Sequence, residues 1–329
     1  MRTTVFSLLI ACCGMTVVHA QTALPEVTRA ADDAAALEEV VITGERAGPR
    51  LWQVKSGDHV LWLLGTLEPL PAKMSWQSQQ VAAVIAESQA VLMDRISVSA
   101  DVGLFAKLGL YLQWRRMQKN ADKQTLQALL PADLYQRFAL LKQRYARTDN
   151  DIEKLRPIMA AQQLNRAATK QIGLSYAPVI AKQVNKLARQ HDIKPQTISI
   201  KVENPGELLT AFKQISPQAE QRCLDATLSR LESDLSFLTA RANAWALGDV
   251  DELRKLLAAD SRTACWDVIN SLPRVQELTK RAEDDWLSAA ESMLKNHKSS
   301  LALRSIRELI AANGALARFR AEGYVVIGP

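Results

Sequence analysis

Apolar runs typical of β-strands lie far apart in this sequence, and long helical patterns separate them. The segment 51–66 contains two such runs joined by Ser-Gly-Asp, a pattern that predicts a β-hairpin. Further strands are expected at 90–96 and 197–203, and a last short strand is expected after Gly323. Few strands, many helices and wide spacing between the strands predict an α/β protein with a small mixed β-sheet core.

Helical patterns occupy most of the remaining chain. One helix is expected at 76–88, and a much longer helical stretch runs from about 101 to 192. Its breaks lie at Pro131, Pro157 and Gly173. Helices resume after the strand at 197–203 and continue to about residue 297. The stretch 101–192 therefore predicts a large helical insertion within the α/β core.

The first twenty residues have the layout of a secretory signal peptide. Arg2 supplies the positive start, and the apolar run Val5–Val18 is too short to span a bilayer comfortably. A small residue, Ala20, then marks a cleavage site. This pattern predicts that segment 1–20 is removed and that the mature protein is periplasmic or secreted. Leu9–Cys12 has the residue types of a lipoprotein signal, which is the rival interpretation.

Residues 21–49 are rich in Ala, Glu, Asp and Thr without a sustained period, and we expect a flexible leader there. A short strand is expected within it at Val40–Thr43. The pattern of a folded chain begins near Leu51, which predicts one domain over 51–329. No segment after the signal offers about 18 uninterrupted apolar residues, so no transmembrane span is expected in the mature protein.

Composition fits a globular protein, because 48% of the 329 residues are hydrophobic and 23% are charged. The formal net charge of +6 is spread along the chain, and the densest basic cluster is Arg115, Arg116 and Lys119 beside Trp114. Nucleic-acid binding usually needs a basic stripe and a recognisable module, and the sequence contains neither. We therefore expect a solvated helix face with Trp114 turned inward, and no nucleic-acid partner.

Two cysteines remain after the predicted signal, Cys223 and Cys265. In an oxidising compartment a lone pair of cysteines is most simply a disulfide. The alternative is a reactive thiol, which needs a nearby base. Neither cysteine has a histidine close in sequence, so the disulfide is the preferred interpretation.

Motifs at both ends of the folded region share the pattern of one family. Leu51–Pro71 is an aromatic hairpin that ends in Gly-Thr-Leu-Glu, and the strand Ala90–Asp94 ends in an acid. Glu203 closes a later strand, and Arg304–Ile327 carries a helix followed by Gly-Tyr and a final strand. These features resemble the TraB/GumN family, which includes the pheromone-shutdown proteins and the TIKI proteases of animals. The resemblance covers about residues 51–328.

The resemblance implies a TraB/TIKI-like α/β fold and a metal-dependent hydrolase. In that family two Gly-x-x-His motifs and a carboxylate are thought to form the metal site. This chain departs from the pattern at both histidines. Glu68 follows Gly65-Thr66-Leu67, and Glu308 takes the position of the second histidine. The loss of both histidines argues against metal catalysis.

The two glutamates nevertheless suggest a retained ligand set. Acids fill 35 of the 329 positions, so two acids at these sites by chance is roughly a one-in-a-hundred event. With Asp94 or Glu203 they would form an oxygen site that favours Mn²⁺, Mg²⁺ or Ca²⁺ over Zn²⁺. Glu68, Glu308 and Asp94 are the expected metal ligands. Glu68, Glu308 and Glu203 are the candidate catalytic carboxylates, one of which would act as general base.

A structural interpretation competes with this one. Glu68 would then form an ion pair with Lys73 or with an Arg across the cleft, and Glu308 would pair with Arg304 at helical i, i+4 spacing. In that case the cleft is a pocket without chemistry. Gly65, Thr66 and Arg281 are the candidate substrate-binding residues, although Arg281 is more often a surface residue beside its acidic neighbours.

The function expected from these observations is a non-catalytic or degenerate-site envelope protein that binds a peptide, a glycan or a protein partner. The alternative is a metal-dependent hydrolase, a peptidase or esterase, that uses a carboxylate-rich divalent site. The sequence contains no Gly-x-Ser-x-Gly elbow, phosphate loop, Cys-x-x-Cys or dinucleotide fingerprint. Serine hydrolases and nucleotide-dependent enzymes are therefore unexpected.

Overall fold

The structure of the chain is a computed structural model. The described residues are 48–74, 76, 78–233, 235–258 and 263–329. The predicted signal segment 1–20 and the strand expected at Val40–Thr43 lie outside them, as does the leader except for its last two residues. No helix among the described residues has the length and apolar character that crossing a membrane requires.

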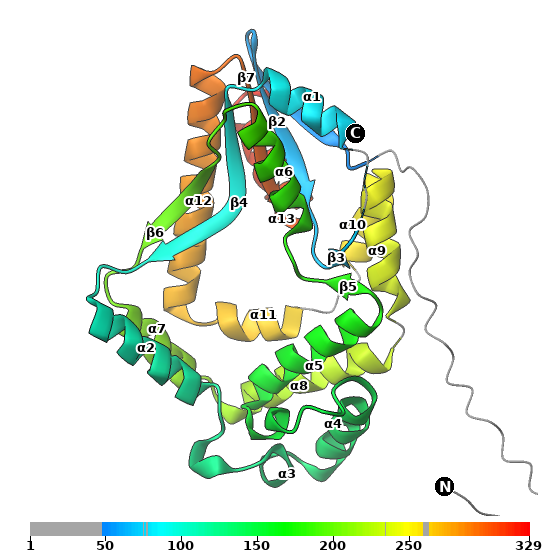
Figure 1. Cartoon of the computed structure of the whole chain (residues 1–329), viewed down its shortest axis with the longest axis vertical. Coiled ribbons are helices and arrows are strands. Elements are labelled where there is room, and N and C mark those ends of the chain that lie inside the picture. The colour runs from blue at the N-terminus through cyan, green and yellow to red at the C-terminus, as the bar shows by residue number, and fades with distance from the viewer. Residues whose placement is uncertain (1–47, 75, 77, 234, 259–262) are drawn as a thin grey trace, which may run out of the picture. The chain divides into compact units, whose positions relative to one another are not determined.

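A six-stranded mixed sheet forms the centre of the fold, as the sequence predicts (Figure 1). Its strands, in sheet order, are β6 (Gln196–Lys201), β4 (Ala90–Ser99), β7 (Ser299–Ser305), β2 (His59–Thr66), β1 (Leu51–Ser56) and β8 (Val325–Ile327). β6, β4, β7 and β2 run parallel, whereas β1 and β8 pair antiparallel. A two-residue pairing of β3 (Leu70–Pro71) with β5 (Leu174–Ser175) lies apart from this sheet.

The predicted hairpin is confirmed. β1 and β2 pair in antiparallel register from Leu51 opposite Leu64 to Ser56 opposite His59. Gly57 in the turn has a φ of 59°, a conformation that glycine adopts without steric cost. The hairpin brings the apolar end of β2 into the centre of the sheet.

The sequence analysis assigned no strand to β7, and this omission is corrected by the structure. β7 lies between β2 and β4, and its residues Leu301, Ala302 and Leu303 are completely buried. A strand covered on both faces has no alternation of polar and apolar residues to reveal it. The segment also follows a long helix without a proline or glycine break.

The helices surround the sheet and build a second layer beyond it. Their bounds are α1 (Gln79–Glu87), α2 (Leu104–Met117), α3 (Leu126–Leu129), α4 (Ala132–Tyr145), α5 (Pro157–Gln171), α6 (Val179–Gln190), α7 (Pro205–Lys213), α8 (Pro217–Glu232), α9 (Ser236–Leu247), α10 (Val250–Ala258), α11 (Thr263–Asn270), α12 (Pro273–Asn296), α13 (Ile306–Ile310) and α14 (Ala315–Ala321). Short 3-10 turns lie at Ala121–Lys123 and Asp151–Lys154.

The expected helical region 101–192 forms as predicted, with α4 and α5 beginning at the predicted proline breaks. α12 packs on one side of the sheet, while α1 and α6 pack on the other (Figure 1). α5 packs against α4 and α8 in the second layer, and α11 joins α8 to α12. This arrangement leaves the carboxyl ends of the parallel strands facing the helical layer.

Candidate functional site

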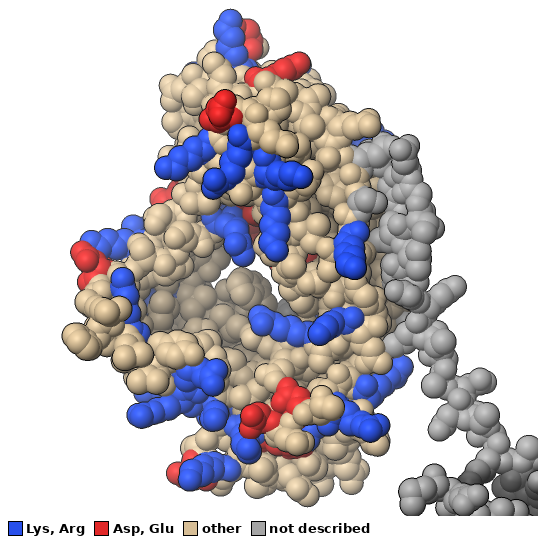
Figure 2. All heavy atoms as spheres, viewed as in Figure 1, with Lys and Arg blue, Asp and Glu red and all other residues tan. Residues whose placement is uncertain are grey.

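A cavity of about 880 Å³ opens beside the carboxyl ends of β2 and β7 and the middle of β4. Residues of these strands and of the segments after β2 and β7 line one side of it, and residues of α5, α6, α8 and α11 line the other. The surface is visibly hollowed here, and Lys and Arg side chains gather around the opening (Figure 2). Ligands of α/β proteins characteristically bind at this edge of a parallel sheet.

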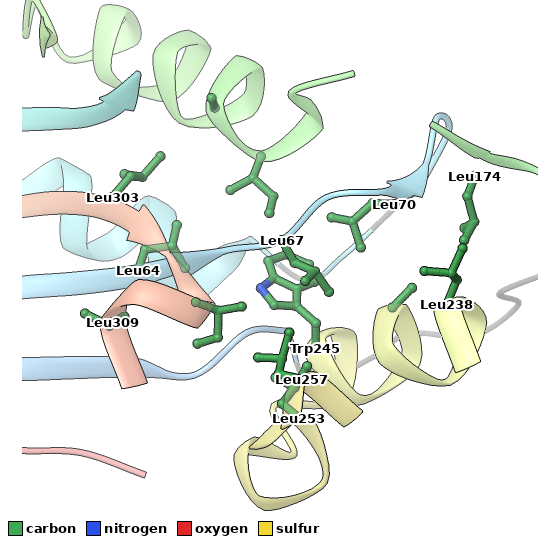
Figure 3. Packing of buried hydrophobic residues seen from close by; sticks show 14 of the residues in the cluster. Leu64, Leu67, Leu70, Leu174, Leu238, Trp245, Leu253, Leu257, Leu303 and Leu309 are labelled. Carbon is green, nitrogen blue, oxygen red and sulfur yellow. The ribbon is translucent and has the colours of Figure 1, made fainter. Parts of the chain in front are cut away.

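The end of β2 is held in place by a buried tryptophan of α9. Trp245 donates its indole N–H to the Gly65 carbonyl at 2.7 Å, and it lies among leucines from β2, its following loop and α10 (Figure 3). Gly65 itself is packed tightly, since a Cβ at this position would lie 2.4 Å from the Ile306 Cδ1 atom. The apolar packing therefore fixes the position of the polar residues that come next, Thr66 and Glu68.

Three predicted acids, Glu68, Asp94 and Glu308, line this one cavity. Glu68 and Glu308 follow the ends of β2 and β7, and Asp94 lies midway along β4, so only the parallel arrangement of these strands brings them together. Thr66 also lines the cavity and donates its hydroxyl to Asp94 Oδ2 at 2.6 Å. The gathering of these four residues agrees with the cleft expected from the sequence.

Glu68 is exposed to the cavity opening, and its backbone is held by the protein. Arg241, which is completely buried, donates from Nη2 to the Glu68 carbonyl at 3.1 Å. Desolvation raises the pKa of the Glu68 carboxyl, and the negative charge of Asp94 raises this pKa further, while Arg95 opposes the shift. The environment of Glu68 thus disfavours the ionised form of its carboxyl group.

Glu308 forms an ion pair at the start of α13. Arg304 Nε lies 2.7 Å from Glu308 Oε2, and the Arg304 side chain is only 8% exposed whereas that of Glu308 is 54% exposed. The guanidinium stacks 5.0 Å from the centre of the Trp286 ring, whose indole N–H donates to the Leu303 carbonyl at 3.1 Å. Desolvation raises the pKa of the Glu308 carboxyl, Arg304 opposes this shift, and the charges of Glu283 and Asp94 add to it.

Cationic side chains also line the cavity, and the sequence analysis did not single them out. They are Arg95, Arg166, Arg230 and Arg307. Arg230 donates from Nη2 to the Asn165 side-chain oxygen, and Arg307 donates from Nη1 to the Leu257 carbonyl at 3.0 Å. Two of them had a sequence signal, because Arg95 directly follows Asp94 and Arg307 directly precedes Glu308. The cavity therefore presents both signs of charge to a ligand.

The strand β4 leaves an open edge beside the cavity. It pairs with β7 from Ala90 to Leu92, and beyond this point the described residues supply a partner only on the β6 side. The Val202 N–H donates to the Ser99 carbonyl, so the Ser99 backbone points toward β6. Because backbone groups alternate along a strand, Val98 directs its N–H and carbonyl toward the open edge. Unpaired edges of this kind accept an added strand.

Gly65, predicted to bind substrate, is buried and does not line this cavity. Two other predicted site residues lie away from it. Glu203 lines a shallow hollow between α2 and α7, beyond the far end of β6. Arg281 is half exposed on α12, where its Nε lies 3.9 Å from Asp285 Oδ2. The described residues contain no group of three or more His, Cys, Asp or Glu side chains placed to hold a metal ion.

The two cysteines lie at disulfide-bonding distance, as the sequence predicts. Cys223 of α8 and Cys265 of α11 have Cα atoms 4.5 Å apart. Cys265 lies in the cavity lining, and residues of α8 line the same side, so this link joins two helices of one cavity wall. A structural role fits this position better than a role as nucleophile.

Comparison with known proteins gives one match. The family model described as the TraB/PrgY/gumN family matches residues 50–327. No curated protein and no solved structure matches the chain. The matched range spans the whole sheet and the cavity.

Proposed function

The chain belongs to the TraB/PrgY/gumN family, and it carries glutamates where the family motifs have histidines. We propose that it is a secreted or periplasmic protein that binds an extended peptide without cleaving it. The proposed signal segment 1–20 accounts for the location. The cavity at the carboxyl ends of the strands is the proposed binding site. A glycan or a folded protein partner is the competing ligand class.

The ion pair of Glu308 is the observation that carries the non-catalytic part of this proposal. Its carboxylate, at the position of the second family histidine, is engaged by the buried Arg304 at 2.7 Å. Asp94 is similarly engaged by the Thr66 hydroxyl. An Arg directed at a carboxylate lowers the affinity of that carboxylate for a cation, because the two positive charges would compete for one ligand. These contacts support a site whose carboxylates are held by the protein's own side chains.

The open edge of β4 supports a peptide as the ligand. An extended peptide can add to an unpaired strand edge through main-chain hydrogen bonds, a mode that tolerates many side chains. The edge lies next to Asp94 and Arg95 in the cavity lining. Carboxylates and guanidinium groups on the same wall suit a ligand that carries charges of both signs along its length.

A substitution in β4 tests this binding mode. Val98→Pro removes the N–H that faces the open edge and leaves the β6 ladder in place, whereas Val98→Thr keeps the N–H and serves as the matched control. The probe is a pool of fluorescein-labelled ten-residue peptides of random sequence, followed by fluorescence anisotropy. We expect binding by the wild type and Val98→Thr, and a loss of at least about tenfold in Val98→Pro. Equal binding by both variants, or binding of envelope polysaccharides alone, would overturn the strand-addition proposal.

The alternative, a divalent-metal hydrolase of peptides or esters, is favoured by one observation. The charge of Asp94 raises the pKa values of both Glu68 and Glu308, so both carboxyl groups lie within reach of this one negative charge. A divalent cation would relieve such repulsion. Calorimetric titration with Mn²⁺, Mg²⁺ and Ca²⁺ tests this, with a Glu68→Gln/Glu308→Gln variant as control. Saturable binding that the variant lacks would favour the hydrolase over the non-catalytic protein.

A further inference from the structure

The outer face of α2 exposes an unusual amount of apolar surface. Leu104 is 78% exposed, Phe105 is 89% exposed and Leu108 is 55% exposed, and Leu112 and Tyr111 continue the same surface. These positions are spaced at i, i+4 and i+8, with Phe105 and Tyr111 beside them, so they share one side of the helix. Contiguous exposed apolar surface of this kind indicates an interaction site.

The inner face of α2 is already occupied. Trp114 packs edge-to-face against Phe212 of α7, with ring centres 6.0 Å apart, and Met117 is buried. The inward position expected for Trp114 is therefore confirmed. α2 is apolar on both sides, which is the pattern of a helix covered on both sides. The protein covers one side through α7, so the outer face is available for a partner.

The charges on α2 indicate what this partner is. Residues 102–121 contain the cations Lys107, Arg115, Arg116 and Lys119 and no Asp or Glu. By helical spacing, Lys107 and Arg116 flank the apolar outer face on opposite sides, and Arg115 lies at its carboxyl end. An apolar face bordered by Lys and Arg is the arrangement of helices that lie in the interface of a bilayer, where the cations meet anionic headgroups.

We propose that the outer face of α2 docks the protein on the surface of an anionic lipid bilayer. Leu104, Phe105 and Leu108 enter the boundary between headgroups and acyl chains, and the flanking cations contact lipid phosphates. A second copy of the chain is a poorer occupant, because two α2 helices packed face to face would oppose their basic residues without an acid between them. The proposal is independent of the peptide site.

Vesicle co-sedimentation of the mature chain tests this proposal. The vesicles contain either pure phosphatidylcholine or an equal mixture of phosphatidylcholine and phosphatidylglycerol. We expect binding to the anionic vesicles only, and we expect added salt to weaken it. A Lys107→Gln/Arg115→Gln/Arg116→Gln variant should bind about 100-fold more weakly, since each cation near the surface contributes roughly a fivefold factor.

An apolar variant and a matched control separate docking from unspecific adsorption. Leu104→Ser/Phe105→Ser/Leu108→Ser should lose vesicle binding, whereas Leu140→Ser, at a site on α4 that is 68% exposed, should not. A Phe105→Trp probe should shift its emission to shorter wavelength on anionic vesicles only. Equal binding to neutral vesicles, or no binding to either kind, would overturn the proposal. So would light scattering that shows a dimer which the apolar variant alone dissociates.

Discussion

The pairing of Arg304 with Glu308 makes the sharpest prediction, because it decides whether the Glu308 carboxylate is available to a ligand. The perturbations are Arg304→Met, which keeps most of the buried volume, and Glu308→Ala. Combined in a double-mutant cycle, they isolate the interaction between the two side chains. The cycle should be measured at about pH 8, because the raised pKa of Glu308 must be exceeded for the carboxylate to be fully ionised.

The expected magnitude follows from the burial of the two partners. Arg304 is 8% exposed and Glu308 is 54% exposed, so the pair falls between exposed pairs, which contribute up to about 1 kcal/mol, and fully buried pairs, whose rupture costs about 3–5 kcal/mol. We expect a coupling energy of about 1–1.5 kcal/mol. Arg304→Met should cost about 2–3 kcal/mol in total, since it also removes the stacking on Trp286, worth roughly 0.5–1 kcal/mol.

Urea denaturation followed by tryptophan fluorescence measures all four corners of the cycle. The slope of the unfolding free energy against urea should be unchanged, so that midpoint shifts report stability directly. A coupling energy below about 0.3 kcal/mol would refute the reasoning. Glu308 would then be unengaged and available as a metal ligand, and the balance would move toward the hydrolase.

Three further predictions follow from the site. Glu68→Gln should raise the free energy of unfolding at about pH 8 by less than about 1 kcal/mol and leave it unchanged at about pH 4. The raised pKa of Glu68 in the folded state means that the ionised carboxylate destabilises the fold, and this effect vanishes below the ordinary pKa of 4.5. Gly65→Ala should destabilise by about 1–2 kcal/mol through the clash with Ile306. Replacing Cys223 and Cys265 by alanine should cost about 4 kcal/mol, since the link closes a separation of 42 residues. Thermal and urea unfolding at the stated pH values measure all three.

Each of these predictions has a control and a contradicting result. A Glu68→Gln effect that is constant over pH would show that the cause is not ionisation. Gly206→Ala, at a helical glycine with open space around it, should be neutral or stabilising, and an equal loss at both glycines would contradict the packing argument. Reduction of the wild type by dithiothreitol should reproduce the loss of the alanine variant, and an unchanged midpoint would mean that the cysteines are not linked.

Short sequence patterns predicted those helices and strands that are determined by a few neighbouring residues. The hairpin of β1 and β2, the strand β4 and the proline starts of α4 and α5 depend on turn residues, apolar runs and helix breaks, all of which act over a few residues. The central strand β7 was missed for the same reason. Its burial on both faces comes from β2, β4 and the helices that cover them, which are distant in sequence.

The sequence by itself determined which acids mark the site, and the tertiary structure decided what they do there. Glu68 and Glu308 were identified by the resemblance, which places them at the two motif histidines, and Asp94 was identified because the acid closes a strand-like run. Glu203 follows the same rule locally but lies beyond the far end of the long, bent β4–β6 pair, away from the cavity. The sequence suggested the Arg304–Glu308 ion pair from its i, i+4 spacing, but only the structure shows that the Arg304 guanidinium is buried against Trp286. This burial distinguishes the pair from an exposed ion pair on the surface. Distances between side chains and their access to water depend on packing between distant segments, and no local pattern encodes them.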